Sequence, residues 1–185
     1  MKILMVSSYL PYPLFSGGHI RLFNLMKNLK KDGHSITLVC EKRDHQSQND
    51  IKNVSKVCDR VITFNRKKQW TPKNIVSAGF SKNSFLTVGH RLPEMEKAIK
   101  EELAREKYDL IHIETFYVFQ NVPKTKLPTV LTEHNIEYLV YKRYADKAPL
   151  IARPLLSLDV LKIKNEEKGW WKKATKLVAG SPQEK

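Results

Sequence analysis

Cysteine is scarce in this chain: 185 residues contain only Cys40 and Cys58, and no CxxC pair is present. Disulfide-stapled folds need several cysteines, and zinc sites need clustered cysteine and histidine. The scarcity therefore argues against both, and we expect no metal centre. Each cysteine borders an apolar run, which indicates a buried, reduced thiol.

Long apolar runs are also missing. No stretch approaches the roughly 18 residues that a membrane-spanning helix needs. The opening MKILMV is shorter than the apolar core of a signal peptide, which has about 7–15 residues. We therefore expect a cytoplasmic protein, and the length suits one domain that buries a real core.

Acidic residues are few relative to basic ones, with 19 Asp and Glu against 33 Lys and Arg and a net charge of +14. Such an excess favours an anionic partner, whether nucleic acid, acidic lipid headgroups or a phosphorylated ligand, without choosing among them.

Residues 60–93 contain no acidic residue at all, and we expect the part that follows the strand at 57–64 to be long and irregular. Its basic and aromatic side chains suit an element lying on an anionic membrane, and also single-stranded nucleic acid. A solvated loop whose aromatics pack on the core is the third interpretation. The candidate surface residues are Arg66, Lys67, Lys68, Trp70 and Lys73.

Short apolar runs alternate along the chain with amphipathic helical patterns. We expect strands at residues 2–7, 34–40, 57–64, 108–113, 128–133 and 175–179, and helices at 17–32, 93–107 and from 154 to about 171. Residues 41–53 lack periodicity and are expected to be loop, with a helical turn as the alternative. This alternation predicts an α/β fold with a parallel sheet covered by helices on both faces.

In such sheets, ligands bind beyond the carboxyl ends of the strands. Gly17 and Gly18 stand there, at the start of the first helix, where a phosphate could approach unpaired backbone N–H groups. The spacing matches neither a G-x-G-x-x-G fingerprint nor a P-loop. An anion site and a simple loop-to-helix turn therefore stay equally open.

Polar residues follow two further strands at the same edge. Glu114 ends "YDLIHIE", whereas His112 lies inside that strand and is expected to serve the core. His134 and Asn135 follow "PTVLTE", where they could bind a sugar hydroxyl or merely form structural hydrogen bonds. Glu137 is either part of that site or a first-turn carboxylate of the next helix.

Four segments together resemble the N-terminal domain of GT-B fold glycosyltransferases of the family-four (group 1) kind. They are "KILMVSSYLPYPLFSGGHIRLFNLMKNLKKDGHSITLVC", "YDLIHIE", "PTVLTEHNIE" and "TKLVAGSPQEK". The resemblance implies a Rossmann-like half of a two-domain enzyme, with this half binding mainly the acceptor. A second domain, expected to lie outside residues 1–185, would bind a nucleotide-diphosphate sugar, which is a co-substrate and not a bound cofactor. Transfer in this family retains the anomeric configuration.

The resemblance also assigns residues. Gly17 and Gly18 match the loop that approaches the donor phosphates or the acceptor, and His134 matches a histidine close to the transferred sugar. The expected acceptor or sugar contacts are His19, Glu114, Asn135, Glu137 and Ser181. The acceptor is expected to be a glycan or a lipid-linked molecule. Lipid-linked or membrane-bound acceptors are common in the family, which favours peripheral attachment to the inner face of the cell membrane. Residues 1–185 alone are expected to lack transferase activity.

Two rival functions remain. A basic α/β protein that binds nucleic acid would explain the charge, but no motif for a specific nucleic acid is present. A non-transferring GT-B relative, such as a nucleotide-sugar epimerase, would share the fold and differ in its product.

Overall fold

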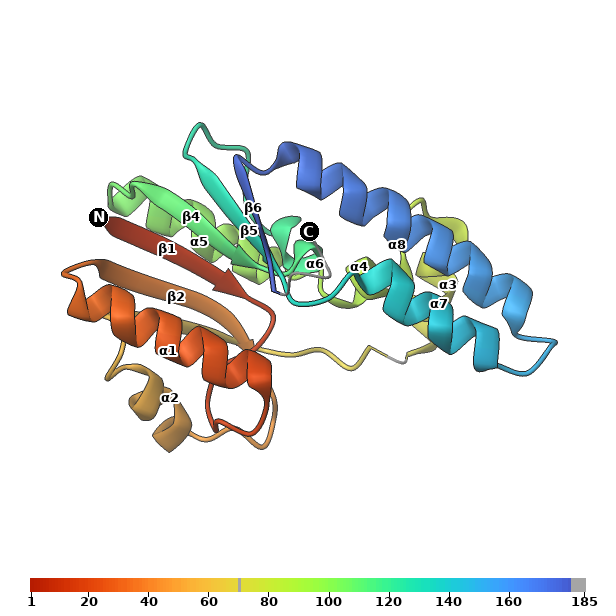
Figure 1. Cartoon of the computed structure of the whole chain (residues 1–185), viewed down its shortest axis with the longest axis horizontal. Coiled ribbons are helices and arrows are strands. Elements are labelled where there is room, and N and C mark those ends of the chain that lie inside the picture. Colours follow the sequence, from red (N-terminus) through yellow and green to blue (C-terminus); the bar gives the residue numbers. More distant parts are fainter. Residues whose placement is uncertain (70, 181–185) are drawn as a thin grey trace.

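The computed structural model of the chain describes residues 1–69 and 71–180. They form a six-stranded sheet in the order β3-β2-β1-β4-β5-β6, and every neighbouring pair is parallel (Figure 1). The strands are β1 Lys2–Ser7, β2 Ser35–Lys42, β3 Arg60–Asn65, β4 Leu110–Glu114, β5 Thr129–Glu133 and β6 Lys176–Ala179. The predicted Rossmann-like α/β fold is confirmed.

Helices connect the strands. They are α1 Gly17–Lys31, α2 Gln48–Val54, α3 Pro72–Phe80, α4 Phe85–Gly89, α5 Pro93–Arg105, α6 Phe116–Phe119, α7 Glu137–Lys147 and α8 Arg153–Lys173. The first of them shows how local sequence sets the bounds. Ser16 caps α1 by accepting from the backbone N–H of His19, and Gly33 stops it with a φ of 81°.

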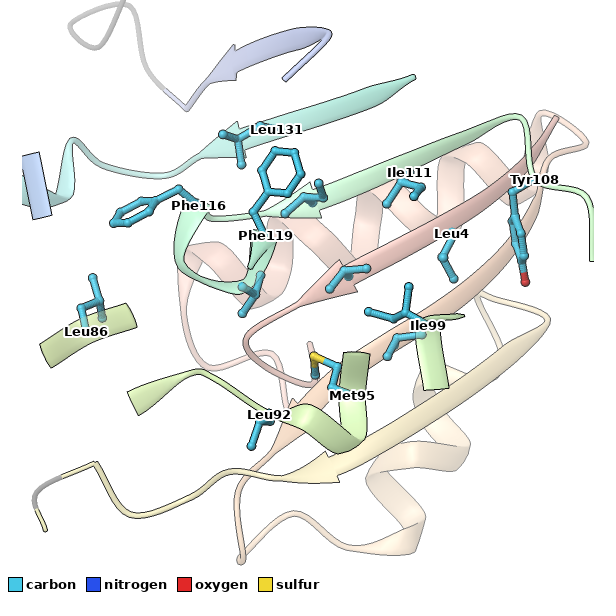
Figure 2. Packing of buried hydrophobic residues seen from close by; sticks show 14 of the residues in the cluster. Leu4, Leu86, Leu92, Met95, Ile99, Tyr108, Ile111, Phe116, Phe119 and Leu131 are labelled. Atoms are coloured by element: carbon cyan, nitrogen blue, oxygen red, sulfur yellow. The ribbon is translucent and has the colours of Figure 1, made fainter. Parts of the chain in front are cut away.

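Two apolar layers cover the sheet because alternate residues of a strand point to opposite faces. Ile3 and Met5 of β1 pack with Leu22 and Met26 of α1. Leu4 faces the other way, into a layer closed by helices α4, α5, α6 and α8. Figure 2 shows it there with Met95 and Ile99 of α5 and Phe119 of α6. Strand β1 is therefore buried on both sides, as its continuous apolar run predicts.

Two segments that were expected to be mainly irregular contain helices. Residues 41–53 include most of α2, whose start is a capping box in which Ser47 and Asp50 bond each other's backbone N–H groups. The stretch after strand β3 holds helices α3 and α4, which are capped by Thr71 and Ser84. The capping residues could be recognised in the sequence. The helices themselves were not predicted, because they are short, have weak apolar periodicity and lie in charge-rich segments.

Helices α7 and α8 form an antiparallel hairpin whose turn projects beyond the carboxyl ends of the strands, and α8 runs back from there to the start of β6 (Figure 1). Glu167 of α8 joins the two helices because its carboxylate accepts from the backbone N–H groups of Glu137 and Tyr138, at 2.8 and 3.1 Å. These are orphan donors in the first turn of α7, so the bond fixes where α7 begins.

Candidate functional site

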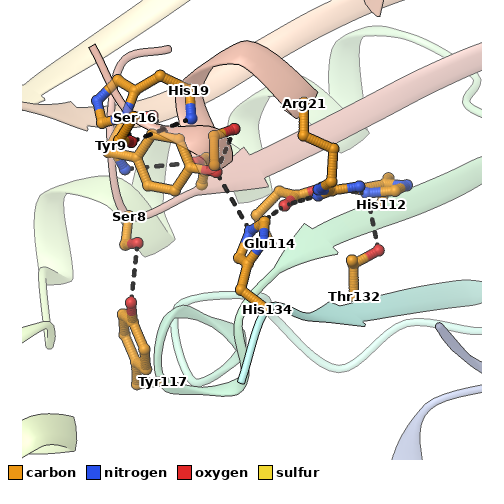
Figure 3. Close-up of polar contacts among 12 residues, drawn as sticks. Ser8, Tyr9, Ser16, His19, Arg21, His112, Glu114, Tyr117, Thr132 and His134 are labelled. Atoms are coloured by element: carbon orange, nitrogen blue, oxygen red, sulfur yellow. Dashed lines mark hydrogen bonds and ion pairs between the residues drawn. The ribbon is translucent and has the colours of Figure 1, made fainter. Parts of the chain in front are cut away.

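The site lies where the strand order reverses. From β1 the chain builds β2 and β3 on one side and β4, β5 and β6 on the other. The carboxyl ends of the central strands are in register, with Ser7 opposite Glu114 and Glu114 opposite Thr132. Such a switch point leaves a crevice between diverging loops, which is the usual ligand position in open α/β sheets. The predicted edge therefore brings Gly18, Glu114 and His134 together through Tyr9. Figure 3 shows Tyr9, Glu114 and His134 side by side.

Glu114 is the centre of this edge, and its side chain is 0% exposed. One carboxylate oxygen accepts from His112 Nε2 at 2.6 Å; the other accepts from His134 Nε2 at 2.8 Å and from the guanidinium of Arg21. Burial alone would raise the pKa of Glu114. The hydrogen bonds from both histidines and the charge of Arg21 outweigh burial, and they hold the pKa well below its usual range.

His134 is held through one ring nitrogen. Its Nε2 lies 2.8 Å from Glu114 and 3.2 Å from the hydroxyl oxygen of Tyr9, whose own O–H donates to the carbonyl of Gly18. Two acceptors around Nε2 make it a protonated nitrogen, so in the neutral imidazole the lone pair is on Nδ1. Nδ1 has no partner among the described residues, and 19% of the side chain is exposed.

The two glycines at the start of α1 differ in their surroundings. A Cβ on Gly17 would meet nothing within 4 Å, whereas a Cβ on Gly18 would lie 3.3 Å from the Tyr9 hydroxyl oxygen. The space beside Gly17 is thus open, whereas Gly18 makes room for Tyr9 and His134. The first turn of α1 carries no acidic side chain that would compete with an anion.

Aromatic rings line the same loop. His19 lies between Tyr9 and Phe15, with ring centroids 4.7 and 4.3 Å away, and its Nδ1 is 2.6 Å from Ser16 Oγ. Burial, together with the charge of Arg43, lowers the pKa of His19. Burial and the Glu114 charge raise the pKa of Tyr9. Tyr9 therefore stays protonated and able to donate to Gly18 at neutral pH.

Glu133 is a second buried carboxyl at this edge, one residue before His134. Burial and the nearby charge of Glu167 raise the pKa of Glu133 to about 9, so it is protonated at neutral pH. Its Oε1 is 3.4 Å from the indole Nε1 of Trp171. Asn135 is exposed, and Glu137 is half-buried in the first turn of α7.

The predicted basic surface is only partly described. Arg66, Lys67 and Lys68 follow β3 and line a recess of about 350 Å³ with Arg43, Asp44 and His45 from the loop after β2. Lys73 belongs to α3, and Trp70 and Ser181 lie outside the described residues.

Three residues of the site were missed by the sequence predictions: Tyr9, Arg21 and His112. Arg21 follows Gly17 by four positions and so returns to the same face of α1, a spacing that could have suggested it. His112 was expected to serve the core, and it bonds both Glu114 and the hydroxyl of Thr132, at 2.6 and 3.3 Å. No local pattern points to Tyr9, because its partners follow β1 and β5.

Within residues 1–69 and 71–180, no group of three or more His, Cys, Asp or Glu side chains is placed to hold a metal ion. Over the same described ranges, none of the helices combines the length and the apolar character needed to cross a bilayer.

The fold and the edge define a Rossmann-like domain with a polar site at its switch point. The pattern of the family described as Glycosyltransferase Family 4 matches residues 15–184, and the chain belongs to this family. An uncharacterized 44.6 kDa protein in the cps region of Klebsiella pneumoniae is 24% identical over 147 residues, which are 76% of this chain and 35% of that protein. The chain thus spans about a third of the length of this curated relative.

Two crystal structures of the C-terminal domain of a hydrogenase from Pyrococcus furiosus are similar at TM-scores of 0.47 and 0.46, with 17% and 16% identity. Each comparison covers 70% of this chain and 89% of that domain. We draw no conclusion about function from TM-scores below 0.5.

Proposed function

We propose that this chain is the acceptor-side domain of a retaining glycosyltransferase, of the hexosyltransferase type. It would move a sugar from a nucleotide-diphosphate sugar to a glycan or lipid-linked acceptor, with no permanently bound cofactor. Membership of glycosyltransferase family 4 supports a transferase, and the relative in a cps region supports a role in polysaccharide synthesis.

One observation carries the site assignment. Glu114 and Tyr9 both occupy Nε2 of His134, which leaves Nδ1 as a hydrogen-bond acceptor on a half-buried ring. A sugar hydroxyl is a matching donor. His134 would thus orient the sugar or the acceptor, and the buried Glu114 would act through His134 without contacting the substrate itself. Positioning of this kind lowers the barrier to transfer without a proton-transfer step.

The start of α1 suits the leaving diphosphate. The unpaired N–H groups of a helix N-terminus attract anions, and Gly17 leaves them uncovered. Negative charge grows on the diphosphate as the glycosidic bond breaks, so a fixed positive dipole stabilises the transition state more than the ground state. We propose that a second domain of the full-length protein binds the rest of the donor, and that residues 1–185 alone are inactive.

A sugar-transfer assay with the full-length protein tests this function. A panel of nucleotide sugars is offered with glycan and lipid-linked acceptors, and both the product and its anomeric configuration are determined. His134→Gln keeps an N–H near the Nε2 position and removes the Nδ1 acceptor, so we expect turnover to fall about 100-fold with little loss of stability. An epimerised nucleotide sugar without transfer would contradict the proposal, as would full activity of His134→Gln.

Exposed apolar residues support a second element of the proposal, attachment to an anionic membrane. In α3, Ile75, Val76 and Phe80 are exposed, and Phe80 is 94% exposed. Lys162 of α8 bonds the carbonyl of Ala78, so α8 lies beside this helix. Apolar exposure continues along α8 and its turn, at Leu150, Ile151, Leu155, Leu158 and Leu161.

Apolar side chains among many lysines and arginines match the interface of an anionic bilayer, where both kinds of group are stabilised. Co-sedimentation with vesicles that contain anionic lipid tests the assignment. Phe80→Ser should weaken vesicle binding several-fold, whereas Ile20→Ser, which alters an exposed apolar residue of α1, should not. Equal binding by both variants, or binding that ignores lipid charge, would contradict it.

A further inference from the structure

The recess beyond β2 and β3 is a separate feature of the sheet edge, and its lining is strongly basic. Arg43, Arg66, Lys67 and Lys68 line it, with one carboxylate, Asp44. Among the described residues, Lys67 pairs with Glu94 at 3.0 Å, and the other three cations form no ion pair. Four cations against one lining carboxylate leave the recess with a net positive charge, so a bound anion would stabilise the arrangement.

A buried chain of hydrogen bonds positions the arginine of this recess. His90 lies 2.8 Å from Glu41 through Nδ1, and both side chains are almost fully buried. The other nitrogen, Nε2, lies 2.6 Å from the Gln69 amide and 3.3 Å from the Arg66 guanidinium. Arginine only donates, so Nε2 is the acceptor and Nδ1–H donates to Glu41.

This chain of bonds distinguishes the recess from a patch of mobile surface lysines. Glu41 sets the tautomer of His90, and His90 in turn holds one edge of the Arg66 guanidinium. A guanidinium held on one edge presents its remaining N–H groups in a fixed fork, which matches the oxygens of a phosphate. The volume of about 350 Å³ accommodates one or two phosphoryl groups.

The recess lies too far along the edge to serve the phosphates of the sugar donor. Between it and His134, the sheet order places β1 and β4. Three to four strand positions of about 4.8 Å separate the two places by about 17 Å. A diphosphate bonded directly to a sugar at His134 cannot span that distance.

We propose that the recess binds a phosphate or diphosphate group of the acceptor, at a distance from the hydroxyl that receives the sugar. That the bound group belongs to the acceptor rests on the proposed transferase function. That the recess binds phosphate does not depend on that function. It names the acceptor class as a phosphorylated glycan or a lipid-linked diphosphate, which share this chemistry.

Calorimetric titration with inorganic pyrophosphate at constant ionic strength tests the recess directly on this chain. We expect a saturable site whose affinity depends on Arg66. Arg66→Gln should weaken it about tenfold, the loss typical of one charge-assisted hydrogen bond. Glu94→Gln frees Lys67 and should tighten binding about twofold. Arg153→Gln, at the distant start of α8, is the matched control and should leave the affinity unchanged.

The outcomes separate the recess from the wider function. Absence of saturable binding, or equal weakening by Arg66→Gln and Arg153→Gln in folded proteins, would overturn the inference. In the full-length enzyme, Arg66→Gln should raise the KM for the acceptor about tenfold and leave the KM for the donor unchanged. If transfer occurs and neither KM moves, only the recess assignment fails. If pyrophosphate binds through Arg66 and no transfer is found, only the proposed transferase function fails.

A competition arm identifies the source of the phosphate. Soluble sugar phosphates that displace pyrophosphate, with no effect of anionic vesicles, indicate a soluble phosphorylated glycan. Displacement by vesicles carrying a lipid-linked diphosphate, and not by vesicles of ordinary anionic lipid, indicates a lipid-borne acceptor. Displacement by every anionic surface alike would mean unspecific charge attraction and would overturn the proposal.

Discussion

His134 Nε2 lies 2.8 Å from the carboxylate of Glu114, although the two residues end or follow different strands and lie 20 positions apart. Glu114 is fully buried, and it also holds Arg21 and His112. One carboxylate therefore links α1, β4 and the loop after β5. Changes at Glu114 should affect the stability of the domain and the orientation of His134 together.

Glu114→Gln should lower the free energy of unfolding by about 3 kcal/mol at pH 7, because a buried charge network loses its anion. The depressed pKa of Glu114 means that its contribution is present above about pH 4.5 and fades as the pH falls below that value. Urea unfolding at pH 7 and pH 3.5 checks this. The double variant with Arg21→Gln should cost at least about 1 kcal/mol less than the sum of the single variants.

Gly17→Ala and Gly18→Ala form a matched pair at the start of α1. Alanine at Gly18 would place its Cβ 3.3 Å from the Tyr9 hydroxyl oxygen, so we expect a loss of about 1 kcal/mol and a displaced Tyr9. Alanine at Gly17 meets no atom within 4 Å and should be neutral or stabilise by up to about 1 kcal/mol. Thermal unfolding compares the Tm of the two variants. An equal change in Tm would contradict the prediction, because it would mean that the Tyr9 side chain moves away without cost.

Glu133→Gln should flatten the pH dependence of stability. The pKa of Glu133 is about 9 in the folded chain against 4.5 unfolded, so the folded state binds the extra proton between these values. Stability therefore falls as the pH rises from about 4.5 to 9, and the glutamine variant lacks this loss. Its Tm should exceed that of the unaltered chain by several degrees at pH 8 and match it at pH 5. A constant difference across pH would contradict a protonated Glu133.

Both cysteines should resist thiol reagents in the folded chain. Burial raises the pKa of Cys58 to about 12, and burial with the neighbouring Cys58 raises the pKa of Cys40 well above its usual value. Labelling at pH 8 should be slow in buffer and complete, with two thiols per chain, in concentrated urea. Rapid labelling without urea would show that one thiol is exposed.

Much of the sheet was predictable because buried parallel strands form continuous apolar runs. Strand β1 has the predicted bounds, and α1 begins within a residue of the prediction. Strand β3 begins three residues later than expected, since Val57 and Cys58 are buried in the preceding turn. Helices α3 and α4 were missed because they are short and each begins at a single capping hydroxyl, whereas the basic composition of the segment is typical of a loop.

The sequence by itself determined the fold class, the edge of the sheet that carries the site, and the positions of Gly17, Gly18, Glu114 and His134 on it. These follow from periodicity and from the ends of apolar runs, which are local properties. Only the tertiary structure decided that Glu114 is buried beneath His134, that Gly18 makes room for Tyr9, and that Arg66 is held by His90 from 24 residues away. Such pairings depend on strand order and register, which bring together side chains that no local pattern relates.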